Sequence, residues 1–328
     1  MPAVVPDSLD SVLAVLRAAG RLGDASSVRP LPGGVSSIIA VLDEDTAPRV
    51  VKAARRRLDV PQHWTADPRR ALREGICLAA LGGAIGPVRV PRLYHVHPDP
   101  PILELEWFGP PAANWKGELL GGLVDGDVVA ALAAGMTALH RAAIPAQLDG
   151  PAGVRLFEKL RLAPYYRAVA AAQPRYAPAL LALIDECLAV RPPYLVHGDF
   201  TPKNVLVTRA APVLLDWEVV HGGDPAFDLG MLTAHLLLKA SRHPALPASP
   251  LLAAASQLAA SYSGPADPGR AVRHAGAIML ARLWGKSTVE YLASAAQRAA
   301  AAAIGERALV GGYPSLDALL AELDQEET

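Results

Sequence analysis

The sequence predicts an α+β fold in which a small β-rich lobe precedes a larger, mainly helical lobe. Its 328 residues suit two domains better than one. Strand patterns dominate the first third of the chain, and helical patterns dominate the remainder. Hydrophobic residues make up 52% of the chain and charged residues 19%, which is typical of a globular protein with a large core. We expect the boundary near Gly109–Pro111, which gives lobes of residues 1–108 and 109–328.

The first lobe is predicted to contain a hairpin, two helices and two further strands. Two β-branched runs, 35–42 and 49–53, flank the acidic turn DEDTAP, and this pattern favours a hairpin. Asp67 precedes an amphipathic run and is the expected N-cap of a helix over 67–81. The remaining elements of the lobe are a helix over 8–19 and two strands within 90–108.

The second lobe is predicted to be helical except for short strands in the 195–220 region. Apolar residues recur there at helical spacing, and alanine runs such as 299–303 favour helix as well. The expected helices cover 123–142, 155–172, 176–190, 226–240, 249–262, 270–295 and 315–325.

Composition excludes several classes of protein. The net charge of −1 gives no basic field for nucleic acid, so we expect no nucleic-acid partner. Two distant cysteines, Cys77 and Cys187, form neither a disulfide framework nor a zinc site and favour a reducing compartment. No apolar run is long enough for a membrane span, and the first residues lack the basic start of a signal peptide. We therefore expect a soluble, cytoplasmic protein without a membrane partner; oligomeric state is open, and a homodimer is one alternative.

The stretch LVHGDFTPKNVLV, residues 195–207, places polar side chains between two apolar runs. It contains Asp199 and Asn204, and Asp216 follows the next apolar run in VLLDWE. A first carboxylate can orient or deprotonate a hydroxyl, while an amide oxygen and a second carboxylate suit Mg²⁺ that holds nucleotide phosphates. The alternative is a polar turn whose Asp and Asn satisfy their own backbone.

Further upstream, the chain carries groups that suit phosphate binding. Gly33 and Gly34 begin a strand, where backbone can approach a phosphate and the hydroxyls of the following residues, Ser36 and Ser37, can donate. Lys52 stands alone on an apolar strand and needs a partner, for which Glu74 on the 67–81 helix is the candidate. The alternatives are an ordinary hairpin turn and two unrelated surface charges.

These motifs resemble the aminoglycoside phosphotransferase/choline-kinase-like superfamily, over about residues 28–295. The resemblance implies a protein-kinase-like two-lobe fold and a kinase that uses ATP and Mg²⁺ on a small-molecule acceptor. It implies Asp199 as the catalytic base, Asn204 and Asp216 as metal ligands, and Glu218 as a second metal contact, directly or through water. It also implies that Lys52 and Glu74 form a phosphate-anchoring pair. The segment Glu106, Trp107 and Phe108 would be the adenine-binding hinge. His197 and Asp228 would brace the catalytic loop.

The acceptor stays open at this stage. Among the branches of the superfamily, the chain looks most like 5-methylthioribose kinase, which points to Arg282, Trp284 and Lys286 as acceptor-pocket residues; ordinary surface cations on a helix are the alternative. Lys203 either stabilises the transferring phosphoryl group or faces solvent. An antibiotic, a sugar such as methylthioribose and an amino alcohol such as choline all fit, and a nucleotide-binding pseudokinase with a regulatory role is the non-enzymatic alternative.

Overall fold

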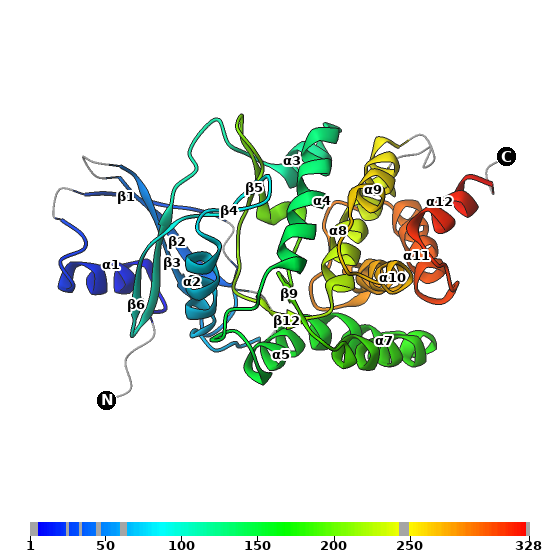
Figure 1. Ribbon diagram of the computed structural model, residues 1–328, viewed down its shortest axis with the longest axis horizontal. Coiled ribbons are helices and arrows are strands. Elements are labelled where there is room, and N and C mark those ends of the chain that lie inside the picture. Colours follow the sequence, from blue (N-terminus) through cyan, green and yellow to red (C-terminus); the bar gives the residue numbers. More distant parts are fainter. Residues whose placement is uncertain are drawn as a thin grey trace.

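The protein is represented by a computed structural model that describes residues 6–23, 26–32, 35–43, 47–59, 64–242 and 249–325. A β-sheet lobe lies at one end of the molecule and a larger helical lobe at the other (Figure 1). This arrangement confirms the α+β, two-lobe fold predicted from the sequence. None of the helices in the described residues is both long and apolar enough to cross a membrane.

The sheet of the first lobe has five strands in the order β1-β2-β3-β7-β6, and all neighbours are antiparallel. The predicted hairpin is confirmed as β2 and β3, and the two strands expected within 90–108 are confirmed as β6 and β7. β1 was not predicted. The bounds are β1 (Ser27–Pro30), β2 (Ser37–Asp43), β3 (Arg49–Ala54), β6 (Leu93–Pro98) and β7 (Pro101–Glu106).

The two faces of this sheet have different neighbours, because successive side chains on a strand point to opposite sides. On β3, Val51 and Ala53 pack into a small core with α1 (Leu9–Ala18). Ala54 belongs to the main core, and Lys52 of the same face reaches α2 (Arg70–Leu81). In Figure 1, α2 accordingly lies between the sheet and the helical lobe.

The start of α2 differs from the prediction. The helix begins at Arg70, and its N-cap is Arg69 rather than Asp67. The carboxylate of Asp67 instead accepts a hydrogen bond from Arg69 N at 2.9 Å, because Pro68 and Arg69 form a turn before the helix begins.

A second five-stranded sheet, built of shorter strands, joins the lobes. Its order is β4-β5-β11-β10-β8, and β5 runs parallel to β11 while the other neighbours are antiparallel. A separate ribbon pairs β9 with β12. These strands hold the polar stretch described below, with bounds β4 (Ala84–Ile85), β5 (Val88–Arg89), β8 (Ala113–Asn114), β9 (Tyr194–Val196), β10 (Val205–Val207), β11 (Val213–Leu214) and β12 (His221–Gly223).

The helical lobe contains mostly the helices expected. In chain order they are α3 (Trp115–Leu120), α4 (Gly126–Arg141), α5 (Pro151–Phe157), the π-helical η1 (Glu158–Arg167), α6 (Ala168–Ala172), the 3₁₀ turn η2 (Pro174–Tyr176), α7 (Ala177–Ala189), the 3₁₀ turn η3 (Pro202–Asn204), α8 (Pro225–Ala240), α9 (Pro250–Ser261), α10 (Pro268–Trp284), α11 (Ala295–Val310) and α12 (Leu316–Gln325).

Two helix predictions need correction. The helix expected over 270–295 ends at Trp284, where Gly285 supplies the C-cap, and residues 285–294 form an irregular segment. The helix expected over 155–172 begins at Pro151 and contains a π-helical stretch with Pro164 inside it. Proline has no N–H for an α-helical hydrogen bond, so a locally widened helix accommodates it.

Candidate active site

The polar stretch forms a buried loop, residues 197–204, between β9 and β10. Gly198 has φ of +77°, and a Cβ atom there would lie 3.0 Å from Val219 O, so the position requires glycine. The loop is held from α8, where Asp228 Oδ2 accepts from His197 N at 2.7 Å and Asp228 Oδ1 accepts from Gly198 N at 2.8 Å. These are the contacts expected of a brace.

The brace extends in both directions from the loop. His140 Nε2 lies 3.2 Å from Asp228 Oδ2, which ties α4 to the same carboxylate. His197 Nε2 lies 3.1 Å from Leu215 O, next to Asp216, and its Nδ1 accepts from Asp199 N at 3.1 Å. Burial lowers the pKa of His197, so its imidazole is neutral near pH 7 and can accept this bond.

The two carboxylate oxygens of Asp199 have unequal surroundings. Oδ2 lies 3.1 Å from Arg161 Nη2 and 3.0 Å from Lys203 Nζ. It also accepts from Asn204 Nδ2 at 2.8 Å. Oδ1 is buried and has no hydrogen-bond partner within the described residues. Since Asp199 is only 1% exposed, Oδ1 is a buried acceptor whose hydrogen-bonding capacity is unmet among the described residues.

The charge on Asp199 is fixed by its neighbours. Burial alone would raise its pKa, but the positive charges of Arg161, Lys203 and Arg282 outweigh burial and hold that pKa well below its usual range. The carboxylate is therefore ionised throughout the physiological pH range.

Arg161 was not predicted from the sequence. It lies on η1, where its Nε donates to Gly198 O at 2.8 Å and its Nη2 reaches Asp199. An arginine between Leu160 and Leu162, three residues before Pro164, was the available signal: a charge on an apolar face beside a helix irregularity.

Asn204 and Asp216 lie next to each other, because Leu215 N donates to Asn204 O at 2.8 Å. The amide nitrogen of Asn204 is engaged by Asp199, which leaves its Oδ1 for a cation. Asp216 follows β11 with φ of +66°, and its side chain is about a quarter exposed. Two such oxygen donors fit Mg²⁺, so the donor set suits the predicted metal.

Lys52 connects the lobes. Its Nζ lies 2.7 Å from Glu74 Oε2 and 2.6 Å from Asp216 Oδ1. Burial alone would lower the pKa of Lys52, but the carboxylates of Asp216 and Glu74 overcome it and raise that pKa. Lys52 is therefore a fixed cation beside the carboxylate that is predicted to hold the metal.

Glu218 is bound by a residue that the sequence did not indicate. Its Oε2 accepts from Arg70 Nε at 2.9 Å, and both side chains are buried. Arg70 Nη2 also donates to Ser36 O at 2.6 Å. One carboxylate oxygen of Glu218 is thus occupied, and its role as a second metal contact stays a prediction.

The other residues predicted to bind nucleotide are spread along the first lobe. Gly33 and Gly34 lie outside the described residues. Ser36 is half-buried, and the hydroxyl of Ser37 is buried without a partner among the described residues. Their contact with phosphate stays a prediction.

The predicted hinge, Glu106 to Phe108, is stabilised by arginines. Arg89 Nη2 lies 2.6 Å from Glu106 Oε1, and its guanidinium stands 4.8 Å from the centre of the Phe108 ring. The guanidinium of Arg29 likewise lies over the ring of Trp107, 5.3 Å from its centre. Arginines from outside the segment therefore hold it in place, and its contact with adenine stays a prediction.

The acceptor-pocket candidates separate in space. Arg282 is buried and near enough to Asp199 for its charge to lower that pKa. Trp284 instead stacks on Tyr176 with ring centres 6.2 Å apart, and Lys286 is exposed. The Lys203 side chain is 51% exposed while its Nζ reaches Asp199, which suits a group at the rim of a site.

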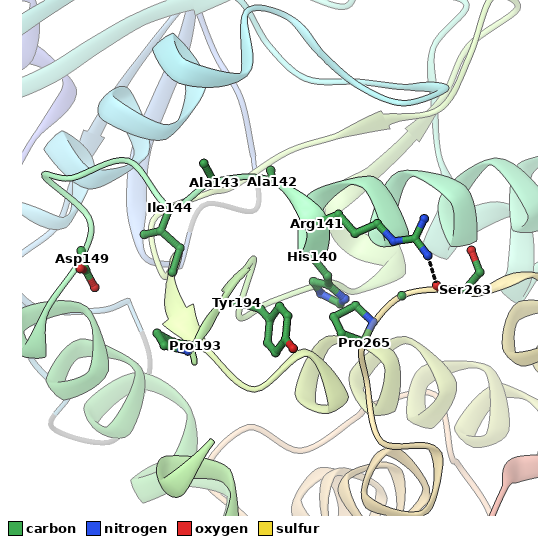
Figure 2. A pocket seen from close by; sticks show the side chains of 11 residues that line it. His140, Arg141, Ala142, Ala143, Ile144, Asp149, Pro193, Tyr194, Ser263 and Pro265 are labelled. Atoms are coloured by element: carbon green, nitrogen blue, oxygen red, sulfur yellow. Dashed lines mark hydrogen bonds between the residues drawn. The ribbon is translucent and has the colours of Figure 1, made fainter. Parts of the chain in front are cut away.

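An open pocket of about 610 Å³ lies elsewhere, at the C-terminal end of α4 (Figure 2). Tyr194, Asp149 and Pro265 line it, and Arg141 donates to Ser263 O across one side. His140 is the link to the site, through its contact with Asp228. None of the residues predicted to bind nucleotide, metal or acceptor lines this pocket.

A histidine pair on β6 has a third neighbour that the sequence did not show. His95 and His97 rings lie 4.5 Å apart, and His97 Nε2 lies 3.0 Å from Glu104 Oε1 on β7. Glu104 is already bound by Arg21 and Arg49, each at 2.9 Å. Two guanidinium groups on the carboxylate oppose a cation there, so we interpret the cluster as structural.

The model of the family described as "Phosphotransferase enzyme family" matches residues 27–271. A search of curated proteins found no match.

Solved structures share the fold across nearly the whole chain. A choline/ethanolamine kinase family protein from Mesorhizobium loti has a TM-score of 0.56 at 18% identity, covering 96% of this chain and 99% of that one. Macrolide 2'-phosphotransferase MphH from Brachybacterium faecium has a TM-score of 0.50 at 22% identity, covering 93% and 98%. The ternary complex of streptomycin, ATP and APH(2")-IIa has a TM-score of 0.51 at 11% identity, covering 96% and 99%.

The family match spans three quarters of the chain, and the fold it shares with these structures is the protein-kinase-like one expected from the sequence. The chain belongs to the phosphotransferase enzyme family and is a small-molecule kinase.

Proposed function

We propose that this enzyme transfers the γ-phosphate of ATP to a hydroxyl group of a small molecule, with Asp199 as the catalytic base. The observation that carries the proposal is the asymmetry of Asp199: three donors hold Oδ2, while Oδ1 is buried and unpartnered. A carboxylate held in this way can accept a hydrogen bond from one ligand hydroxyl in a fixed direction.

The residues around Asp199 have complementary tasks in this proposal. Lys52 binds phosphate oxygens once ATP enters, and Glu74 keeps its ammonium in place. Asn204 and Asp216 hold Mg²⁺, with Glu218 as the second contact. Bound Mg²⁺ neutralises negative charge on the phosphates. Lys203 and Arg161 lie beside Asp199 and oppose the negative charge of the transferring group.

The low pKa of Asp199 limits its role to orienting the hydroxyl and receiving its proton late. A strongly ionised carboxylate is a weak base, so most of the acceleration has to come from positioning and charge neutralisation, as in other phosphoryl transfers. The ATP in the APH(2")-IIa complex supports ATP as the donor in this family.

The test is ADP release by the purified protein with ATP and Mg²⁺ across a panel of acceptors. The panel contains aminoglycosides, macrolides, amino alcohols, pentoses and hexoses including methylthioribose, and hydroxy acids. We expect Asp199→Asn to reduce acceptor-dependent release by about 10²–10⁴-fold. Asp127→Asn, an exposed carboxylate at the start of α4, is the matched control and should not change the rate.

An unchanged rate in Asp199→Asn would refute the assignment of the base. ATP binding without turnover for any acceptor would instead favour the pseudokinase alternative.

A further inference from the structure

Two buried basic side chains in the helical lobe have no acidic partner among the described residues. Arg282 on α10 is 6% exposed and Lys239 on α8 is 2% exposed. Arg282 and Lys239 take part in none of the ion pairs found in the described part of the chain. A buried charge without a counter-charge is costly, and functional sites are where such groups persist.

The guanidinium of Arg282 is only partly satisfied. Its Nη1 donates to Ser287 O at 2.9 Å and to Ser287 Oγ at 2.6 Å, and the group stacks 4.8 Å above the Tyr165 ring. Nη2 has one long contact, 3.4 Å to His235 Nε2, and the buried Nε has no partner within the described residues. The Nε–Nη2 edge is one of those through which arginine binds a carboxylate or phosphate with two hydrogen bonds.

The ammonium of Lys239 is satisfied even less. Its Nζ donates to His235 O at 3.1 Å and lies 5.3 Å from the centre of the Tyr291 ring. The hydroxyl of Tyr291 is buried and unpartnered among the described residues. Burial, with the charges of Lys116 and Arg282, lowers the pKa of Lys239 to about 7.

The acids near this cluster do not neutralise it. Glu290 is bound to Lys116 at 2.6 Å, and its side chain is 72% exposed. Asp199 is already paired with Arg161 and Lys203.

Arg282 is near enough to Asp199 for its charge to lower the pKa of that carboxyl. Burial and the charges of Arg282 and Lys239 lower the pKa of His235 between them. The surroundings of Asp199 therefore carry surplus positive charge.

We propose that the acceptor carries an anionic group beside its hydroxyl, a carboxylate or a phosphate monoester, and that Arg282 and Lys239 bind this group. The proposal rests on the proposed function for the hydroxyl. The surplus charge opposes polycations such as aminoglycosides and quaternary amines such as choline, because like charges near a buried cation are repelled.

The chemistry is that of the proposed function with a restricted acceptor. The acceptor oxygen forms a bond to the γ-phosphorus as the bond between that phosphorus and the ADP oxygen breaks. The hydroxyl proton passes to Asp199 and then to solvent. The products are ADP and an acceptor with one further phosphate beside its original anionic group.

The experiment compares matched acceptors with and without the anion. ADP release is measured with glycerate and with glycerol 3-phosphate against glycerol, and with sugar phosphates against the free sugars. Choline and an aminoglycoside complete the set. We expect turnover with either the carboxylate or the phosphate compounds, and which of the two sets reacts identifies the anionic group of the acceptor. We expect no turnover with the neutral or cationic compounds.

Variants assign the effect to the two cations. Arg282→Gln and Lys239→Met should each raise KM for the anionic acceptor about 10- to 100-fold, since each removes a charge-assisted hydrogen bond, with a smaller effect on kcat. Arg282→Lys keeps the positive charge but lacks the pair of parallel N–H donors of the guanidinium, so it should give an intermediate KM. Lys159→Met, an exposed lysine of η1, is the control.

A binding measurement that needs no catalysis separates this proposal from the proposed function. Glycerate and inorganic phosphate, each with ADP present to fill the nucleotide site, should raise the unfolding temperature of Asp199→Asn but not of Asp199→Asn combined with Arg282→Gln. Stabilisation without any turnover would support the anion site while contradicting the kinase activity. Turnover of neutral or cationic acceptors, unchanged in Arg282→Gln and Lys239→Met, would overturn the anion site and leave the kinase activity intact. No stabilisation by either anion would also overturn it.

Discussion

Replacement of Asp228 by asparagine tests whether one carboxylate positions the loop 197–204, which holds the proposed catalytic base. Asp228 is fully buried and accepts from two backbone N–H groups, those of His197 and Gly198, at 2.7 and 2.8 Å. Asparagine keeps one acceptor oxygen and turns an NH₂ group toward the other donor. Two buried donors, that backbone N–H and the new NH₂ group, then lack an acceptor. At about 1–3 kcal/mol each, the change should cost about 2–6 kcal/mol of unfolding free energy.

The same change should reduce kcat, because the displaced backbone includes the residues directly before Asp199. A displacement of about 1 Å at a reacting group can cost about 10²-fold in rate. Urea unfolding gives the first quantity, and ADP release at saturating ATP and acceptor gives the second. KM for ATP should change little, since Lys52 and Glu74 do not contact Asp228.

The control is Asp125→Asn, because Asp125 caps the exposed start of α4 through Asp127 N at 2.8 Å. Asparagine is about as good a cap as aspartate, so this variant should lose little stability. The bracing argument is refuted if the unfolding free energy of Asp228→Asn lies within about 0.5 kcal/mol of the unmodified protein's value and kcat is unchanged, because substitutions at the surface alone have effects of that size.

Three further predictions concern the links between the lobes and the buried histidine of β12. Lys52→Met should lower kcat/KM for ATP by at least about 10²-fold in steady-state ADP release, while Lys159→Met should not; equal values would exclude Lys52 from phosphate binding. Arg70→Leu should cost about 3–5 kcal/mol in urea unfolding because Glu218 stays buried without its cation, and adding Glu218→Gln should recover part of that loss; strictly additive losses would contradict the pairing. Burial lowers the pKa of His221 to about 4 in the folded protein. As pH falls below about 6.5, the imidazole is therefore protonated in the unfolded chain before it is protonated in the folded one. The unfolding free energy should decline by about 3 kcal/mol between pH 7 and pH 4 because of His221. His221→Gln should reduce this slope of unfolding free energy against pH, and an unaltered slope would show that the imidazole is not the group responsible.

Local sequence patterns predicted those parts of the fold and site that depend on neighbouring residues. Lys52 stands alone on an apolar strand and needs a partner, for which Glu74 on the 67–81 helix was the candidate. The structure places Lys52 Nζ 2.7 Å from Glu74 Oε2, while the role of the pair in phosphate binding stays a prediction. The order of strand, polar loop and strand around Asp199 likewise follows from short-range hydrophobic patterns.

The unpredicted contacts join residues far apart in sequence. Arg161 reaches Asp199 across 38 positions, and Arg70 reaches Glu218 across 148. Neither arginine has a local pattern that identifies its partner, because each pairing arises only when η1 and α2 pack near the loop 197–204 and the segment after β11. For α11, the alanine run 299–303 favoured helix but no bounds were predicted, because the sequence has little apolar periodicity to mark the ends of the helix.

The position of α2 also affects how the molecule folds. This helix packs on β7 through Gly75, where a Cβ atom would lie 3.1 Å from Leu103, and its Arg73 donates to Val220 O at 3.1 Å in the other lobe. Leu78 and Leu103 share one continuous hydrophobic core with Leu132 and Leu232 of the helical lobe. The inner half of the sheet lobe would thus lose its covering if the helical lobe were absent, and elements that share a core unfold together. The two lobes should therefore melt in one cooperative transition, and an isolated fragment ending at residue 108 should not fold.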